Sequence, residues 1–141
     1  MALDLGCHGG QLASVLAGRG GIEELVQCDL SPAMLGQAEG IRLAVDEEVL
    51  PFADGQFDLI ISNLSLHWVN DLPGAFSQIR RALKPDGLFL CAMLGGGTLD
   101  ELRQSLMAGE IAAKGGASPR VSPFVDPHDA GALMQRAGFA L

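Results

Sequence analysis

Short apolar runs alternate along the chain with segments whose apolar residues recur at helical spacing. The runs predict five strands, at residues 2–5, 24–28, 41–45, 57–62 and 88–94. The last three runs are too uniformly apolar to have one face in water, which is typical of parallel strands buried on both faces. The segments between and after them predict helices at residues 11–17, 32–39, 72–83, 99–113 and 127–137. This alternation predicts the α/β fold class, and no internal repeat or linker divides the chain.

Polar residues and prolines mark where two of these helices begin. Ser31-Pro32 and Asp126-Pro127 each offer a side chain that can cap the first turn, followed by a proline in the first helical position. The residues Lys84-Pro85-Asp86-Gly87 predict a turn that leads from the helix at 72–83 into the last strand.

The composition narrows the class of protein. The chain has 141 residues, 48% of them hydrophobic, with a mean hydropathy of +0.28, which is enough for one buried core. Its formal net charge of −8 repels phosphate backbones and argues against a nucleic-acid partner. No apolar run reaches the roughly 18 residues of a membrane span, and no signal peptide is recognisable. Cys7, Cys28 and Cys91 form no C-x-x-C pair, so we expect no zinc site, no disulfide framework and a reducing compartment.

A glycine cluster follows the first strand, at Gly6, Gly9 and Gly10. Such a turn between a strand and a helix lets a ligand approach the backbone closely, and an acidic residue at the end of the next strand can accept from ribose hydroxyls. Asp29 lies nineteen positions after Gly10, at the end of the second predicted strand. The alternative is a tight turn and an aspartate that caps the next helix.

Longer segments resemble a known family. "DLGCHGG", "VDEEVLPFADGQFDLIISNLSLHWVND" and "RRALKPDGLFL" resemble motifs of the class I S-adenosylmethionine-dependent methyltransferases. Within that superfamily the chain is most similar to the branch of the biotin-pathway malonyl-carrier-protein methyltransferases and the methyltransferase-fold assembly factor of mitochondrial complex I. "GGGTLDELRQSL" and "SPRVSPFVDPHDAGALMQRAGF" resemble the assembly factor more closely. The resemblance implies a Rossmann-like, doubly wound, mainly parallel sheet with strand order 3-2-1-4-5.

The resemblance also implies a set of residues that bind the cofactor S-adenosylmethionine. By position these are Asp4, Gly6 and Gly10 around its methionine end, Asp29 on the ribose hydroxyls, Asp46 with the backbone of Glu47 at the adenine amine, and Asn63 beside the sulfonium. Carboxylates and carbonyls of this kind suit a cationic methyl donor, and methyl transfer then needs alignment of the acceptor in a dry site.

His8 departs from the family's pattern, because it stands where a glycine is usual. A Cβ atom at this position disfavours a positive φ angle. We expect Gly9 and Gly10 to absorb the strain and the His8 side chain to point to solvent. The alternative is a weakened or altered cofactor site.

His67 and Trp68 follow the fourth predicted strand, near the place where a methyl acceptor would bind. His67 is interpreted either as a catalytic base that orients the acceptor or as a residue that starts a helix, whereas Trp68 is expected in the core.

Other polar residues are expected to have structural or solvent-exposed roles rather than catalytic ones. Asp126 and His128 lack a second histidine, so we expect no metal site. The pair Glu47 and Glu48 is expected in a solvated loop rather than as a catalytic dyad. Arg103 and Arg120 could bind an acidic substrate near the site, or they could be solvated surface residues.

Three functions stay open at this point. The first is methyl transfer to a small, carrier-bound or protein acceptor. The second is that of an assembly factor which binds a protein partner, and the third is hydroxylation of an arginine on a complex I subunit. The resemblance implies the cytoplasm of a bacterium or the mitochondrial matrix.

The two ends of the chain carry a further expectation. The first strand has hardly begun at Met1, and Phe139-Ala140-Leu141 resembles the opening of another strand. Methyltransferases of this class normally add a sixth and a seventh strand. We therefore expect residues 1–141 to form one truncated domain that lacks these strands.

Overall fold

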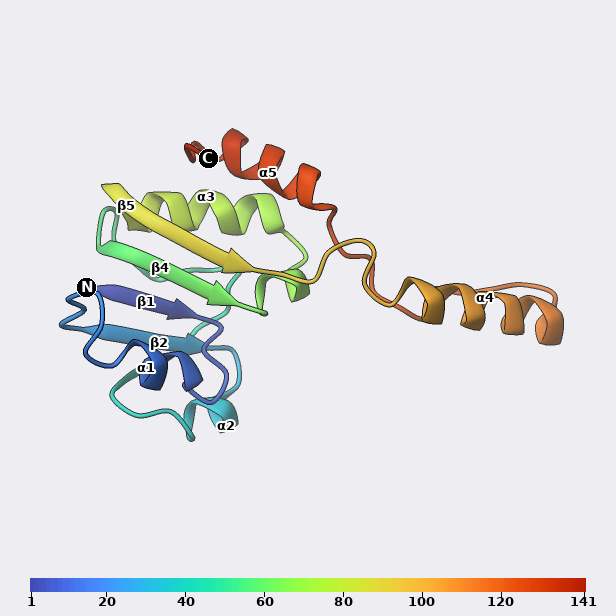
Figure 1. Ribbon diagram of the computed structural model, residues 1–141, viewed down its shortest axis with the longest axis horizontal. Helices are drawn as coiled ribbons and strands as arrows, with labels where there is room; N and C mark the ends of the chain where they lie inside the picture. Colours follow the sequence, from blue (N-terminus) through green and yellow to red (C-terminus); the bar gives the residue numbers. More distant parts are fainter.

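The computed structural model describes residues 1–141 and contains one five-stranded sheet in which all neighbours are parallel. Its order is β3-β2-β1-β4-β5, which confirms the predicted fold class and strand order (Figure 1). The strands are β1 at Ala2–Leu5, β2 at Leu25–Asp29, β3 at Ile41–Ala44, β4 at Phe57–Asn63 and β5 at Leu83–Ala92. After β3, at one edge of the sheet, the chain passes β2 and β1 to reach β4, so β1 and β4 flank the point where the winding reverses.

The helices follow the predicted order. They are α1 at Gln11–Leu16, α2 at Pro32–Leu35, the short 3-10 helix η1 at Leu66–Trp68, α3 at Leu72–Ala82, α4 at Asp100–Lys114 and α5 at Pro127–Arg136. The predicted caps are present, because the side chain of Ser31 accepts from the amide of Met34 and that of Asp126 from the amide of His128. α2 is shorter than predicted and ends before Gly36.

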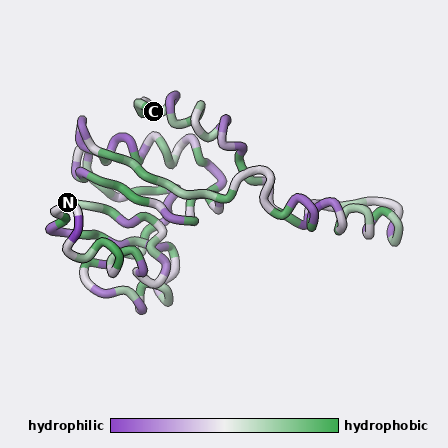
Figure 2. The backbone as a smooth tube through the Cα atoms, in the orientation of Figure 1, coloured by the Kyte–Doolittle hydropathy of each residue, from purple (hydrophilic) through white to green (hydrophobic).

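The core lies between the central strands and α3. Leu3, Leu5 and Ile60 come from β1 and β4, and Phe76 and Ile79 come from α3; all five are fully buried. In Figure 2 the hydrophobic colour runs along the strands, whereas hydrophilic and hydrophobic stretches alternate along the helices. The core therefore fixes the positions of β1 and β4, and the candidate site lies at the ends of these central strands.

Burial on both faces was predicted for the last three strands and is wrong for the two of them that lie at the edges of the sheet, β3 and β5. All four residues of β3 are exposed. In β5 only one face packs, since Phe89 contacts Phe76 of α3 while Leu88 and Leu90 on the other face are exposed. An edge strand has a neighbour on one side only, and an apolar sequence cannot indicate which strands occupy the edges.

The start of β5 also differs from the prediction. The strand begins at Leu83, which pairs with Phe57, and the pairing resumes with Leu88 opposite Leu59. Residues 84–87, predicted as a turn before the strand, therefore form a bulge inside it.

Beyond β5 the chain forms an arm, residues 99–121, that leaves the body of the molecule. α4 contains no buried residue and projects from the edge of the sheet where the strands end (Figure 1). Glu110 joins α4 to the loop that follows it, because its carboxylate accepts hydrogen bonds from Ser118 and pairs with Arg120. None of the helices combines the length and apolar character that a membrane span requires.

Candidate functional site

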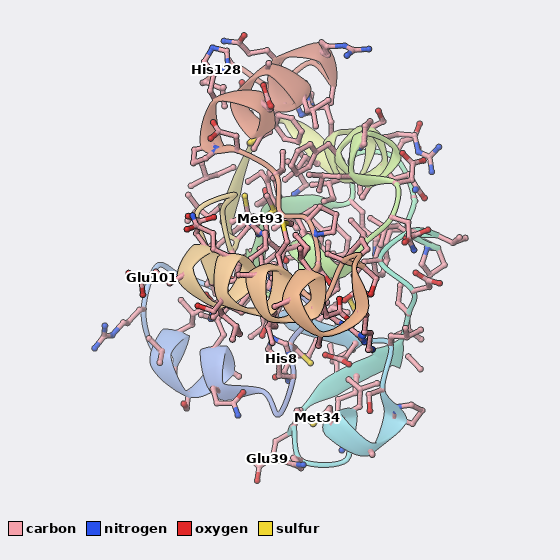
Figure 3. The ribbon with its side chains drawn as sticks, turned by 90° about the vertical axis from the view of Figure 1, so that its right-hand side faces the viewer. His8, Met34, Glu39, Met93, Glu101 and His128 are labelled. Atoms are coloured by element: carbon pink, nitrogen blue, oxygen red, sulfur yellow. The ribbon has the colours of Figure 1, made fainter.

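The predicted site residues gather where the central strands end. Asp4 lies on β1, Asp29 is the last residue of β2 and Asn63 is the last residue of β4. Because these strands are parallel neighbours, their carboxyl ends meet at one edge of the sheet. Figure 3 looks onto this edge, with His8 near the centre and α4 crossing in front of it.

His8 connects two of these strand ends. Its main-chain N–H donates to Oδ2 of Asp29 at 2.9 Å, and its ring Nε2 lies 3.2 Å from the carbonyl oxygen of Asn63. The ring Nδ1 is 3.9 Å from Oδ2 of Asp29. The imidazole thus spans the gap between the ends of β2 and β4, with 40% of the side chain exposed.

The expectation for His8 holds only in part, because the side chain is partly exposed and Gly10 has a positive φ angle, but the ring also contacts Asn63. The residue itself adopts a left-handed backbone, with φ at 51°, so the neighbouring glycines do not take up all of the strain. The hydrogen bond from its N–H to Asp29 holds this conformation, and the ring turns along the site rather than away from it. Leu64, directly after β4, is a second non-glycine residue with a positive φ, at 56°. Strained backbone thus flanks the candidate site on two sides.

The carboxylate of Asp29 accepts two main-chain hydrogen bonds, one from the turn after β1 and one from the residue before α2. Its Oδ2 accepts from the N–H of His8, and its Oδ1 accepts from the N–H of Ser31 at 2.8 Å. Each carboxylate oxygen has a further lone pair, so the group that organises both turns keeps acceptor capacity for a ligand.

Asp4 is the most buried of the site carboxylates, with 1% of the residue exposed. Burial raises its pKa from 3.8 to about 6, a shift that nearby His8 reduces and Asp29 increases. Its Oδ2 is buried and has no hydrogen-bond partner. A buried acceptor without a donor costs free energy, so this atom fits a ligand that brings an N–H group or a positive charge.

Gly6 and Gly10 approach other parts of the protein closely. A Cβ atom on Gly6 would lie 2.2 Å from the Cβ and Oγ atoms of Ser65, and one on Gly10 would lie 2.7 Å from the Cβ atom of Ala38. Both glycines also have positive φ angles, 71° and 79°. The turn therefore needs these glycines for its own packing, whatever it binds.

A hollow of about 210 Å³ opens beside the end of β2. Leu30 and Trp68 line it together with Asp46, Glu47 and Ser65. Asp46 accepts from the N–H of Glu48 through Oδ1, while the buried carboxylate of Glu47 accepts from the hydroxyl of Ser65 at 2.7 Å. The hollow thus contains both residues that the family resemblance assigns to an adenine amine.

The solvated loop expected for Glu47 and Glu48 is not observed. Glu47 is buried against Ser65, and Glu48 is half-buried and accepts from both the main chain and the side chain of Asn70. The prediction for Trp68 is also wrong, because 65% of this residue is exposed. Burial of a side chain depends on which segment packs above it, and the local sequence carries no such information.

His67 lies between two aromatic rings. Its ring centroid is 4.9 Å from that of Trp68 and 5.7 Å from that of Phe124, which follows the arm. Its Nδ1 is buried and has no hydrogen-bond partner. Burial, and to a lesser degree the charge of His8, lowers its pKa below the usual 6.5. The lowered pKa favours the neutral imidazole, the form of histidine that can accept a proton.

The remaining candidates lie outside this cluster. Arg103 pairs with Asp100 at 3.4 Å and Arg120 with Glu110, both within the arm. His128 is exposed beside the cap of α5. The chain contains no group of three or more side chains placed to hold a metal ion.

Ser65 is the site residue that sequence reasoning missed. It contacts the turn after β1 at Gly6 and fixes Glu47, so it joins three loops of the site. Its only signal in the sequence is its place in the segment that follows β4, two positions after Asn63.

Comparison with known proteins agrees with this geometry. Residues 3–91 match the methyltransferase domain family. The chain is 47% identical over 144 residues to a human protein named arginine-hydroxylase NDUFAF5, mitochondrial, an alignment that covers 99% of the chain and 41% of that protein. It is 34% identical to the malonyl-(acyl-carrier protein) O-methyltransferase of Methylovorus sp. (strain MP688), covering 97% of the chain and 49% of the relative. The chain thus spans less than half the length of either relative.

A solved structure supports the fold. The S-adenosylmethionine-dependent methyltransferase of Mesorhizobium loti superposes with a TM-score of 0.75 at 22% identity, covering 99% of this chain and 74% of that one. The methyltransferase domain family implies S-adenosylmethionine as the cofactor. Since the family match spans β1 to β5 and includes the whole edge described above, the chain belongs to the methyltransferase domain family.

Proposed function

We propose that this chain binds S-adenosylmethionine along the carboxyl edge of its sheet and serves as a methyltransferase domain. The observation that carries the proposal is a row of three carboxylates in the spatial order of the strands. Asp46 follows β3, Asp29 ends β2 and Asp4 lies on β1. Such a row suits one elongated ligand that carries an amine, two hydroxyls and a cationic end.

The residues present fit this cofactor. The unpartnered Oδ2 of Asp4 would receive its ammonium group, the free lone pairs of Asp29 its ribose hydroxyls, and Asp46 with the backbone of Glu47 its adenine amine. Gly6 and Gly10 would shape the turn beside its methionine end, and Asn63 would border the sulfonium. When bound, S-adenosylmethionine supplies an activated methyl group.

Protein side chains would then position the acceptor. His67 lies in η1, three residues after Leu64, where the loop after β4 begins, and its lowered pKa keeps the imidazole neutral, so it would orient an acceptor or take up its proton. The aromatic neighbours of His67 keep water from part of the ring, which favours a dry reaction site.

Titration calorimetry with S-adenosylmethionine and S-adenosylhomocysteine tests the proposal. We expect both to bind, and Asp46→Ala to weaken both. Asp54→Ala is the matched control, because Asp54 is an exposed carboxylate that pairs with Arg81 before the start of β4, at the opposite edge. Absence of binding to the unaltered chain, or equal losses in the two variants, would contradict the proposal.

A protein acceptor is the second candidate, favoured by the 47% identity to a protein named as an arginine hydroxylase. The partner would then be a protein that presents an arginine, such as a complex I subunit, and the compartment would be that of this partner. Mass spectrometry of arginine-containing peptides separates the chemistries. Methyl transfer from S-adenosylmethionine replaces a hydrogen atom by a methyl group and releases S-adenosylhomocysteine. Hydroxylation would insert one oxygen atom only when dioxygen and a two-electron reductant are also supplied, with the second oxygen atom leaving as water.

A further inference from the structure

α4 carries apolar side chains that are not buried against the rest of the chain. The helix has no buried residue, and its Leu102 and Leu106 are 46% and 39% exposed. Leu99, directly before the helix, is 52% exposed. Figure 1 shows α4 standing clear of the sheet. A helix gains most of its stability by burying an apolar face, so these side chains favour a partner outside the fold.

The apolar and small residues of α4 follow the spacing of a helix-pairing seam. Positions three and four residues apart form one line along a helix, and this line contains Leu102, Leu106, Gly109 and Ala113. Glycine is a poor helix former, yet Gly109 lies well inside the fifteen-residue helix. A Cβ atom on Gly109 would meet nothing within 4 Å. Packing within the chain therefore does not require this glycine, whereas a second helix could approach closely there.

An antiparallel second copy of α4 matches this seam. When the midpoints of the two helices are aligned, Leu102 of one copy faces Ala113 of the other, and Leu106 faces Gly109. A large side chain thus meets a small one at each level of the seam. The match is reciprocal, so a two-fold axis between the helices satisfies both copies. A parallel pair would instead place leucine against leucine at one end and leave glycine and alanine facing each other at the other end.

The charges of α4 favour the same orientation. Asp100 and Glu101 lie in the first turn of the helix and Lys114 lies in the last. An antiparallel pair places each acidic end beside the basic end of the other helix, whereas a parallel pair brings like charges together. Within their own helix Asp100 pairs with Arg103 at 3.4 Å and Lys114 with Glu110 at 3.5 Å. The side chains of Asp100 and Lys114 are nevertheless more than half exposed, so they can also contact a second copy.

The distribution of charge favours the arm as the place where two copies meet. Residues 99–121 hold three acidic and three basic side chains, so the rest of the chain carries the whole net charge of −8. Two such bodies repel each other, and a projecting neutral arm lets the helices meet while the bodies stay apart. The balanced charge also disfavours an anionic membrane surface, which attracts helices with an excess of lysine and arginine.

From these observations we infer that α4 is a self-association surface, through which two copies of the chain form an antiparallel helix pair about a two-fold axis. Fifteen helical residues span about 22 Å, so the contact is small beside the interfaces of permanent dimers and the association is reversible. The inference does not depend on the proposed function, because it uses no residue of the carboxyl edge of the sheet.

Sedimentation equilibrium from about 1 μM to about 1 mM chain measures the association. We expect the unaltered chain to pass from monomer to dimer in this range, and Leu102→Glu to weaken the dimer roughly ten-fold or more, because it places a charge in the seam. Ile111→Glu is the matched control. Ile111 is similarly exposed, at 52%, but nine positions after Leu102 it lies on the opposite face of the helix, so this variant should still form the dimer.

Cross-linking tests the orientation of the pair. The exposed native thiol is first removed by Cys91→Ser, which leaves only the buried Cys7 and Cys28. A chain with Leu102→Cys and a chain with Ala113→Cys should then form a disulfide with each other when they are mixed and oxidised, because facing residues of an antiparallel pair come within disulfide range. Neither chain should cross-link to a copy of itself.

Three outcomes would overturn the inference. The first is a monomer at about 1 mM, as expected if the arm folds onto its own sheet or binds only a different partner. The second is equal weakening of the dimer by Leu102→Glu and Ile111→Glu, which would place the contact elsewhere. The third is cross-linking of the Leu102→Cys chain to itself, which indicates a parallel pair. All three leave the proposed function intact, since calorimetry measures binding of S-adenosylmethionine separately.

Discussion

The main-chain N–H of His8 donates a 2.9 Å hydrogen bond to the carboxylate of Asp29, and this contact ties the turn after β1 to the end of β2. The imidazole of the same residue continues to the carbonyl of Asn63 at the end of β4. A ligand that contacts both Asp29 and Asn63 must therefore enter the space that this ring occupies. The ring is held by one side-chain hydrogen bond and is partly exposed, so it is free to swing away.

His8→Gly is expected to tighten the binding of S-adenosylhomocysteine several-fold, because the ring no longer has to be displaced. It should also stabilise the fold by about 1 kcal/mol, since φ of 51° is strained for a residue with a Cβ atom. Calorimetry and thermal unfolding measure the two effects. His128→Ala removes an exposed imidazole beside the cap of α5 and should change neither. Weaker binding in His8→Gly would instead mean that the ring contacts the ligand.

Asp29→Ala is expected to weaken cofactor binding by about 1–3 kcal/mol, since the ribose hydroxyls lose a charged acceptor. It should also lower the free energy of unfolding by about 1–3 kcal/mol, because the N–H groups of His8 and Ser31 lose their acceptor. Asp29→Asn keeps one acceptor oxygen, so its affinity and stability should lie between those of the unaltered chain and those of Asp29→Ala. Calorimetry measures the loss of binding free energy, and denaturant unfolding of the same samples measures the loss of stability. If affinity stays constant while stability falls, Asp29 acts only on the turns.

The strands of the sheet were predictable from features that are local in the sequence, whereas their order was implied by the resemblance to the methyltransferase family. β1 and β2 are short apolar runs that end at the glycine turn and at Asp29, and helical segments of the right length separate them. The bulge at 84–87 was not predictable, since it depends on Phe57 pairing with Leu83 across the sheet. The exposure of Trp68 and the contact of Ser65 with Gly6 likewise depend on how distant segments pack. The strand-end acids Asp4 and Asp29 could therefore be found from sequence, but the residues that complete their surroundings could not.

The buried carboxyl of Asp4 should make stability depend on pH. Its pKa is raised from 3.8 to about 6, so the folded state binds the proton more tightly than the unfolded state. Its contribution is therefore fully present below about pH 4 and is lost as the pH rises through about 6, by about 2–3 kcal/mol. Denaturant unfolding from pH 4 to 8 should show this loss in the unaltered chain and not in Asp4→Asn. Parallel pH profiles for the two proteins would show that Asp4 does not titrate in this range.

The contacts of Glu110 with Ser118 and Arg120, which order the arm, should be independent of the stability of the core. Hydrogen bonds from Arg120 and Ser118 lower the pKa of Glu110 from 4.5 to about 2, so these contacts are fully present above pH 4.5 and are lost as the pH falls through about 2. In Arg120→Ala the carboxyl of Glu110, followed by NMR, should titrate closer to 4.5, and the amide of Ser118 should exchange faster.

Global thermal unfolding of Arg120→Ala should nevertheless be unchanged, because α4 buries no residue. Arg103→Ala is the matched control, since it removes an arginine from α4 that does not contact Glu110 and pairs with Asp100. This control should leave both the titration of Glu110 and the exchange of Ser118 as they are. A lower melting temperature in Arg120→Ala alone would contradict the prediction, because it would mean that the order of the arm is coupled to the sheet that carries the site.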